Sequence, residues 1–307
     1  MYDEIRGWSQ SQGEIGIQRM CELAQVSRAS FYRNWEQKAP GEAATTLRDA
    51  VQKAALRHRG YGYRRVAALL ERDGFCVGQE RVRRILKADN LLAIRRRKFI
   101  ATTDSDHPFR VHQNLAESLE LTGINQLWVA DITYIRLRQE FVFLAVVLDA
   151  YSRKAIGWQL GRNLDTSLPL GALEAAIASR NPRPGLVHHS DRGTQYASNQ
   201  YVQRLEACGA HISMSRPARP WENGKCESFM NTLKREEIDA RRYRSFGELQ
   251  ANVEEFLDQV YNRVRLHSAL NYRSPAEFEE SLGKAGAAWS PAALSFSRHE
   301  EIYPDVV

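Results

Sequence analysis

The apolar positions of this 307-residue chain follow two different periods, and the change between them divides the chain. Up to about residue 98, apolar residues recur every three or four positions, which is typical of amphipathic helices. Three strand-like runs then follow, joined by short turns and rich in β-branched and aromatic residues: 127–137, 141–148 and 154–160. Beyond them, helical patterns alternate with short strand-like runs. The pattern therefore predicts small helical units followed by an α/β domain.

The first helical unit, residues 1–40, has the pattern of a helix-turn-helix. Apolar spacing predicts a helix over residues 16–24, and Ser27 is a suitable N-cap for a second helix that runs from Arg28 to Trp35. Two helices joined by a short turn form a common DNA-binding motif. Other small helical hairpins share this pattern, so DNA contact and a purely structural hairpin both remain open here.

The second unit, residues 41–98, contains a basic loop between amphipathic helices. The loop, R-H-R-G-Y-G-Y-R-R over residues 57–65, alternates arginines with glycines, which permit close approach of a partner, and with tyrosines. Arginines beside tyrosines suit phosphate contact. We predict that the following side chains bind DNA, with a solvated basic surface as the alternative: Arg57, Arg59, Tyr61, Tyr63, Arg64, Arg65, Arg81, Arg83, Arg84, Lys87, Arg95, Arg96, Arg97 and Lys98.

Charge is distributed unevenly and supports this division. Residues 1–98 carry 20 lysines and arginines against 11 acidic residues, whereas residues 99–307 carry 23 against 26. The formal net charge of +6 thus conceals a basic N-terminal third and a mildly acidic remainder. A basic part joined to a carboxylate-bearing part is expected if one holds DNA and the other holds metal.

The order of elements after residue 124 indicates the fold class. A three-stranded antiparallel meander is followed by helix, strand, helix, strand and helix, which is the ribonuclease-H-like arrangement with a mixed five-stranded sheet. We assign residues 99–123 to a linker, 124–282 to this α/β core and 283–307 to a C-terminal extension.

Three carboxylates of the core are candidates for catalysis. Asp131 interrupts an apolar strand, where a charged group is costly unless it is paired or bound to metal. Asp191 follows a short strand at a tight polar turn, and Glu227 falls in the first turns of a helix, one turn after Asn223. Three such carboxylates can hold two Mg²⁺ or Mn²⁺ ions for phosphoryl transfer. We therefore predict that Asp131, Asp191 and Glu227 are both the catalytic residues and the metal ligands.

Other side chains compete for these roles. Asp149 also follows a buried strand, and we favour a structural turn residue over a ligand. Glu222 could replace Glu227, but it precedes the helix. His188 and His189 suit a strand end better than a magnesium site, because Mg²⁺ prefers oxygen. The four cysteines are scattered without C-x-x-C spacing, which argues against a disulfide framework and a structural zinc site.

These motifs together resemble a known family. Asp131 in W-V-A-D-I-T-Y, Asp191 in H-S-D-R-G-T-Q-Y and Glu227 in N-G-K-C-E-S-F, with 35 residues between Asp191 and Glu227, are similar to the triad of DDE transposases and retroviral-type integrases. The basic loop and R-V-R-R-I-L-K-A-D-N-L-L resemble the segment before that core in bacterial insertion-sequence transposases. Y-N-R-V-R-L-H-S-A-L, followed by S-P-A, resembles their C-terminal signature.

The resemblance implies a second-frame (OrfB-type) product of a copy-out, paste-in element. Such proteins bind terminal inverted repeats, free a 3′-OH, join it to DNA and integrate a circular intermediate, with Mg²⁺ and as multimers. By analogy, Asn223, Lys225 and Lys234 would lie near DNA beside the metal ions, and His267 would belong to the C-terminal helix backing the site. The long heptad repeat of an upstream-frame partner is absent from this sequence, so such a partner or a frameshift fusion is expected besides homo-oligomers on DNA.

Two alternatives remain beside a transposase: a catalytically silent DNA-binding derivative and a nuclease of the ribonuclease-H-like fold. The intact carboxylates disfavour the first, and the basic N-terminal units disfavour the second. The chain has no apolar run of membrane-spanning length and no apolar leader. We therefore expect a cytoplasmic bacterial protein that associates with the nucleoid when bound to DNA.

Overall fold

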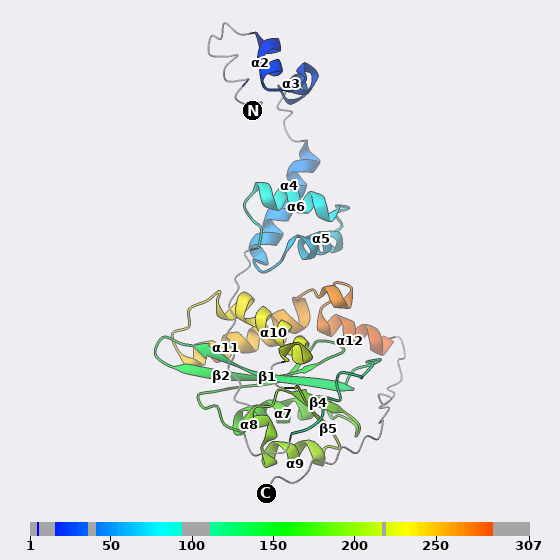
Figure 1. Cartoon of the computed structure of the whole chain (residues 1–307), viewed down its shortest axis with the longest axis vertical. Coiled ribbons are helices and arrows are strands. Elements are labelled where there is room, and N and C mark those ends of the chain that lie inside the picture. The colour runs from blue at the N-terminus through cyan, green and yellow to red at the C-terminus, as the bar shows by residue number, and fades with distance from the viewer. Residues whose placement is uncertain (1–4, 6–15, 36–40, 94–110, 217–218, 285–307) are drawn as a thin grey trace.

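The computed structural model describes residues 5, 16–35, 41–93, 111–216 and 219–284. Figure 1 shows two small helical units and an α/β core following one another along the long axis of the molecule. This order agrees with the change of hydrophobic period along the chain. Every helix in the described part of the chain is too short or too polar to serve as a membrane span.

The first helical unit consists of α2 (Ile17–Leu23) and α3 (Arg28–Trp35). Ser27 caps α3 as predicted, since its Oγ accepts a hydrogen bond of 3.1 Å from the Ser30 amide. Cys21 and Phe31 are buried against each other with Ile5. The pair of helices is thus held by a small apolar contact and one cap.

The second helical unit packs three amphipathic helices around a shared core: α4 (Glu42–Arg57), α5 (Tyr63–Arg72) and α6 (Gln79–Ala88). Val51, Val66 and Val82, one from each helix, are fully buried. Gly74 turns the chain between α5 and α6 with a φ of 88°, in the left-handed region where glycine has no steric penalty.

The core contains one five-stranded sheet in the order β3-β2-β1-β4-β5. The first three strands form the predicted antiparallel meander, and β4 and β5 run parallel to β1. This mixed sheet confirms the ribonuclease-H-like fold. The strands are β1 (Leu127–Arg136), β2 (Phe141–Asp149), β3 (Ala155–Gly161), β4 (Val187–Ser190) and β5 (His211–Met214).

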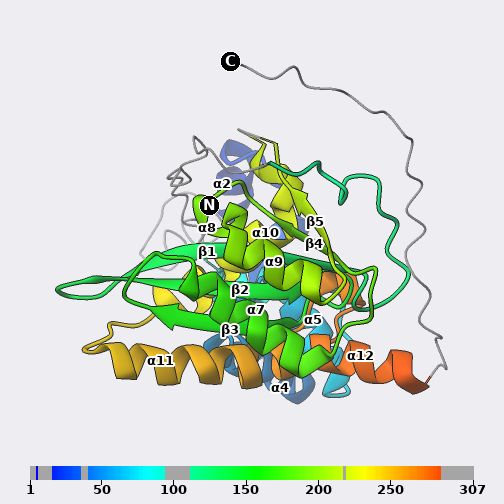
Figure 2. The same ribbon diagram turned by 90° about the horizontal axis from the view of Figure 1, so that it is seen from below.

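Helices cover both faces of the sheet. One face carries α7 (Ser167–Arg180), α8 (Thr194–Ala197) and α9 (Asn199–Ala207), which lie below the sheet in Figure 1 and in front of it in Figure 2. The other face carries the remaining helical segments, which lie between the sheet and α4–α6 (Figure 1). They are η1 (Pro220–Asn223), α10 (Gly224–Leu233), η2 (Lys234–Ile238), α11 (Phe246–Glu255), η3 (Phe256–Val264), η4 (Ser268–Leu270) and α12 (Pro275–Lys284).

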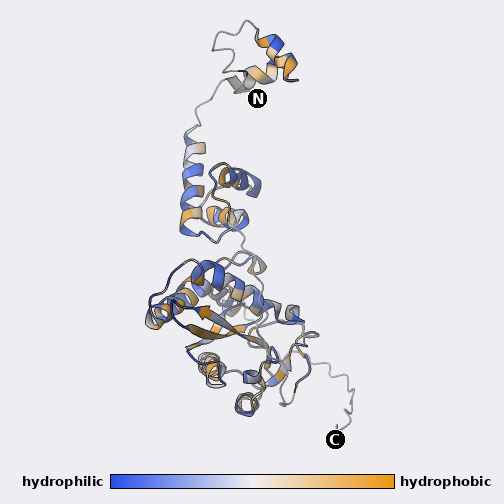
Figure 3. Ribbon diagram, turned by 60° about the vertical axis from the view of Figure 1, so that its left-hand side comes forward, coloured by the Kyte–Doolittle hydropathy of each residue, from blue (hydrophilic) through white to orange (hydrophobic). Residues whose placement is uncertain are grey.

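Side-chain alternation along β1 sends its residues to two separate cores. Leu127 and Val129 pack with Phe229 and Leu233 of α10, whereas Trp128 packs on the opposite face with α7 and α9. Figure 3 shows hydrophobic residues concentrated in the strands at the centre of this sandwich. By the same alternation, Asp131 projects to the α10 face.

The second helical unit is docked directly on the core through the segment after η3. The Tyr61 hydroxyl accepts a 3.0 Å hydrogen bond from the Leu266 amide, and Arg65 Nε donates at 2.9 Å to the Leu266 carbonyl. Leu266 itself is buried in the apolar cluster of α4–α6. Arg72 and Glu277 form an ion pair across the same joint.

Candidate active site

Asp131 occupies the middle of β1 with a partly buried carboxylate. Its Oδ1 accepts a 2.9 Å hydrogen bond from the Ile132 amide. Burial raises the pKa of Asp131 to about 7, with further contributions from the negative charges of Asp191 and Glu227, and the positive charge of Lys234 opposes the rise. Asp131 thus lies within electrostatic range of Asp191, Glu227 and Lys234, each of which comes from a different segment of the core.

Asp191 reaches the site because β4 runs parallel beside β1, with His189 opposite Val129. Just beyond the end of β4, the Gly193 amide donates a 3.0 Å hydrogen bond to Asp191 Oδ1. A Cβ atom at Gly193 would lie 3.1 Å from the same oxygen, so a side chain there would crowd the carboxylate. The turn therefore holds Asp191 in place by backbone geometry.

Glu227 approaches the site from α10. Asn223 connects this helix to the sheet, because its Nδ2 donates a 3.0 Å hydrogen bond to the Ala130 carbonyl, next to Asp131. The amide group of Asn223 is buried and makes this structural contact, and its predicted position near DNA stays a prediction. Its Oδ1 has no hydrogen-bond partner among the described residues. Glu227 is exposed.

Two further groups border the carboxylates. Lys234 places its Nζ 5.1 Å from the centre of the Tyr134 ring, which keeps the cation near Asp131. Tyr196 is buried near Asp131 and Asp191, and its hydroxyl finds no partner in the described part of the chain. Tyr196 is not among the site residues predicted from the sequence. It lies five residues after Asp191, in the same motif, which was the available signal.

The three carboxylates do not form a finished metal cage in this arrangement. Among the described residues, no group of three or more His, Cys, Asp or Glu side chains is arranged to hold a metal ion as it stands. Asp131 and Asp191 each have one oxygen engaged by a backbone amide, and Glu227 faces solvent.

The competing acids have structural roles, as the sequence analysis favoured. Asp149 is fully buried and accepts hydrogen bonds from the amides of Asn125, Tyr151 and Ser152 and from the Ser152 hydroxyl, at 2.6–3.1 Å. Glu222 is occupied by Arg216, at 2.7 Å from its amide and 2.6 Å from its Nε.

The two histidines of β4 are also structural. His188 hydrogen-bonds to Tyr201, and His189 lies between Ser213 and Ser215. Burial lowers the pKa of His188 to about 3 and that of His189 to about 4, so both rings are neutral. The last cysteine before Glu227, Cys226, is fully buried in the core, as expected of a packing residue.

The predicted DNA-binding residues divide into three groups. Tyr61 and Arg65 dock the second helical unit on the core; the burial of Tyr61 corrects its prediction as a DNA contact, whereas DNA contact by the partly buried Arg65 stays a prediction. Residues 95–98 lie outside the described residues, and Tyr63 is partly buried. The others are exposed, and their contact with DNA stays a prediction: Arg57, Arg59, Arg64, Arg81, Arg83, Arg84 and Lys87.

Two lysines and one histidine near the site also differ in their placement. Lys234 lies beside the carboxylates, whereas Lys225 points to a separate cavity on the other side of α10. His267, expected in a helix, follows the end of η3 and pairs in an isolated bridge with Arg273. It faces the same cavity as Lys225.

Family models match most of the chain. An HTH-like domain matches residues 42–99, and two models of the integrase core domain match residues 122–220 and 208–275. A crystal structure of the catalytic core domain of BIV integrase is similar at 16% identity and a TM-score of 0.40, over 53% of this chain and 99% of that one.

Curated relatives extend over nearly all of the chain. The 31 kDa protein of insertion element IS600 from Shigella sonnei is 36% identical, over 87% of this chain and 100% of the relative. Transposase InsF of IS3A from Escherichia coli is 32% identical, over 87% and 95%. The IS904 transposase from Lactococcus lactis is 31% identical, over 76% and 93%. The chain therefore belongs to the insertion-sequence transposases, with an HTH-like domain in front of an integrase catalytic core.

Proposed function

We propose that this transposase cuts and joins DNA strands at the ends of its element, with Asp131, Asp191 and Glu227 as catalytic residues and metal ligands. One observation carries the proposal: Asp131 lies in β1 where burial, and then the negative charges of Asp191 and Glu227, raise its pKa to about 7. A cluster of this kind is costly to the fold and is typical of a functional site.

The chemistry of the side chains fits a hard divalent cation. All three candidate ligands are carboxylates, and oxygen is the ligand that Mg²⁺ and Mn²⁺ prefer. The buried Asn223 Oδ1, beside Asp131, is a further polar atom without a partner among the described residues. Glu227 is free to turn toward the aspartates because it is exposed at the start of α10.

Each residue then has a definite task. When bound by Asp131, Asp191 and Glu227, two Mg²⁺ ions would activate the attacking oxygen and stabilise the leaving 3′ oxygen. The Gly193 amide fixes the Asp191 carboxylate, and Asn223 fixes the start of α10 against β1. Lys234 supplies a positive charge next to the carboxylates, where it can hold a DNA phosphate.

In this proposal the helical units bind the DNA. Seven of the predicted basic side chains are exposed on α4–α6 and their loops, so they are available to the phosphates of the terminal repeats. Because two element ends must be joined, the chain would act as a homo-oligomer on DNA. A product of the upstream frame, as a separate protein or a fusion, is the further partner that we propose.

Strand cleavage and strand transfer on labelled terminal-repeat DNA test the proposal. We expect the wild-type chain with Mg²⁺ to free a 3′-OH and join strands, and Glu227→Gln to bind the same DNA without doing either. Glu206→Gln, an exposed glutamate on α9, is the matched control and should react like the wild type.

Three other outcomes would count against the proposal. Full activity of Glu227→Gln would remove Glu227 from the site. Cleavage without joining would favour a hydrolytic nuclease. Repeat binding without cleavage, also in the presence of the upstream-frame product, would favour a catalytically silent DNA-binding protein.

A further inference from the structure

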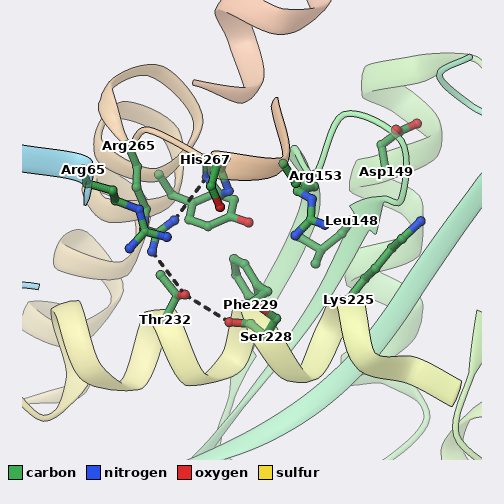
Figure 4. Close-up of a pocket in the computed structure, with 13 residues that line it drawn as sticks. Arg65, Leu148, Asp149, Arg153, Lys225, Ser228, Phe229, Thr232, Arg265 and His267 are labelled. Atoms are coloured by element: carbon green, nitrogen blue, oxygen red, sulfur yellow. Dashed lines mark hydrogen bonds between the residues drawn. The ribbon is translucent and has the colours of Figure 1, made fainter. Parts of the chain in front are cut away.

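A second polar site lies across α10 from the catalytic carboxylates. A cavity of about 110 Å³ opens between α10, the turn after β2 and the segment after η3. Lys225, Ser228 and Thr232 face it from α10, one helical turn apart (Figure 4). Since Glu227 is two residues from Lys225, the helix presents these two side chains to different sides.

The cavity concentrates positive charge. Four cations line it: Arg65, Arg153, Lys225 and Arg265. Figure 4 shows Arg65 and Arg265 entering from one side and Arg153 and Lys225 from the other. The acid in the lining, Asp149, has its oxygens engaged by three hydrogen bonds from its own turn and one from the Asn125 amide.

Two of these cationic side chains are held by partners within the protein, and the other two could bind a ligand. Arg265 is held by Glu236 at 2.8 and 3.0 Å, and Arg65 by the Leu266 carbonyl. Neither Arg153 nor Lys225 forms an ion pair with any described residue. Burial and the charge of Arg153 lower the pKa of Lys225, and the charge of Asp149 partly opposes this. Arg153 and Lys225 are only partly buried, and exposed Ser268 and Ala269 line the cavity, so solvent reaches it.

The backbone conformation of Arg153 is a second indication that its side chain has a function. Its φ is +61°, in the left-handed region that favours glycine or asparagine over arginine. A long charged residue at such a position is expected where its guanidinium has a function. Neutral His267 provides a polar ring beside it, because burial and the neighbouring arginines lower the His267 pKa to about 2.

We propose that this cavity is a phosphate-binding site, with Arg153 and Lys225 as its principal ligands. The inference deepens the proposed function, since the phosphate that a transposase meets at high local concentration is the DNA backbone. The cavity adjoins the joint between the second helical unit and the core, through Arg65, and shares α10 with Glu227. A phosphate bound there would hold the docked helical unit and the catalytic helix in one arrangement.

The first test is thermal unfolding of the full chain in rising inorganic phosphate, at constant ionic strength with chloride. We expect a saturable rise in melting temperature for the wild type. Arg153→Asn, which suits the left-handed backbone, and Lys225→Gln should each need about tenfold more phosphate for half the effect. Arg138→Gln, an exposed arginine of the β1–β2 turn, controls for the loss of one charge.

The second test identifies the source of the phosphate. If it belongs to DNA, terminal-repeat duplex should compete with inorganic phosphate, and each variant should lower the salt dependence of DNA binding by about one phosphate contact. If a free phosphate compound is the occupant, the thermal effect remains and the salt dependence stays as in the wild type.

Equal phosphate effects in the wild type, Arg153→Asn, Lys225→Gln and Arg138→Gln would overturn the inference. The thermal readout does not depend on catalysis, so it separates this inference from the proposed reaction. Asp131→Asn should lose cleavage and keep the phosphate response, and a cleaving enzyme without that response would refute the cavity alone.

Discussion

Two aspartates in neighbouring strands, Asp131 of β1 and Asp149 of β2, show how one residue type serves two purposes. Asp149 accepts four hydrogen bonds from its own turn and the adjacent loop. Asp131 accepts one, from Ile132, and has Asp191 and Glu227 as neighbours. The first is a structural acid whose oxygens are well supplied with donors, and the second is the acid that we propose for catalysis. Burial raises the pKa of both acids, so the comparison teaches that fewer hydrogen-bond donors and neighbouring negative charge set the proposed catalytic acid apart from the structural one.

The largest difference between mutations of the two aspartates should appear in the rate of strand cleavage. Asp131→Asn removes a proposed metal ligand, so we expect strand cleavage to fall at least about a thousandfold, equivalent to roughly 4 kcal/mol of barrier. Repeat binding and the melting temperature should be kept or rise, because the mutation removes a repelled charge. Single-turnover cleavage measures the first effect, and thermal unfolding measures the melting temperature. Retained cleavage would place the reaction elsewhere.

The largest effect on stability should come from the other aspartate. Asp149→Ala deprives three backbone amides of their acceptor, so we expect the free energy of unfolding to fall by about 3 kcal/mol. Urea unfolding measures it. Ser152→Ala, which removes one donor and leaves the acceptor satisfied by the amides, should cost about 1 kcal/mol. An Asp149→Ala protein of wild-type stability would contradict the structural role.

The pH dependence of the free energy of unfolding should show the next largest effect. The pKa of Asp131 is about 7 in the folded protein against 3.8 ordinarily, so between pH 4 and 7 the folded chain keeps a proton that the unfolded chain has released. The free energy of unfolding should therefore fall as pH rises through this window and level off above it. Allowing for solvent at the partly exposed carboxylate, the loss is on the order of 2 kcal/mol.

Urea unfolding of the wild type and Asp131→Asn at pH 5 and pH 8, with a chelator present, isolates this contribution. The variant should gain stability relative to the wild type as the pH is raised. A difference that is the same at both pH values would mean that Asp131 is not protonated preferentially in the folded state.

The smallest effect concerns the joint between the helical unit and the core. Tyr61→Phe leaves the Leu266 amide without its acceptor, and we expect a loss of about 1 kcal/mol in the free energy of unfolding. Tyr63→Phe is the matched control, because that hydroxyl meets only exposed Arg64. Faster hydrogen exchange at the Leu266 amide in Tyr61→Phe alone would locate the effect. Equal losses in both variants would refute this account of the docking.

Sequence can indicate a candidate site residue where the residue type is unusual for its local environment. Asp131 stands out because β-strand periodicity buries its surroundings, and Asp191 and Glu227 stand out as acids at the ends of short elements. Asn223 and Lys225 could not be assigned in this way. Both precede Glu227 on one short segment, yet Asn223 binds the Ala130 carbonyl and Lys225 faces the cavity.

The sequence by itself determined the order of the strands, the helical units before them and the fold class, because hydrophobic period and turn residues act over a few neighbouring positions. Only the tertiary structure decided which of several similar side chains takes which role. Tyr61 docks and Tyr63 does not, and Arg65 binds the core while Arg64 stays exposed. Such choices depend on which distant segment packs against each side chain, here Leu266, some 200 residues along the chain.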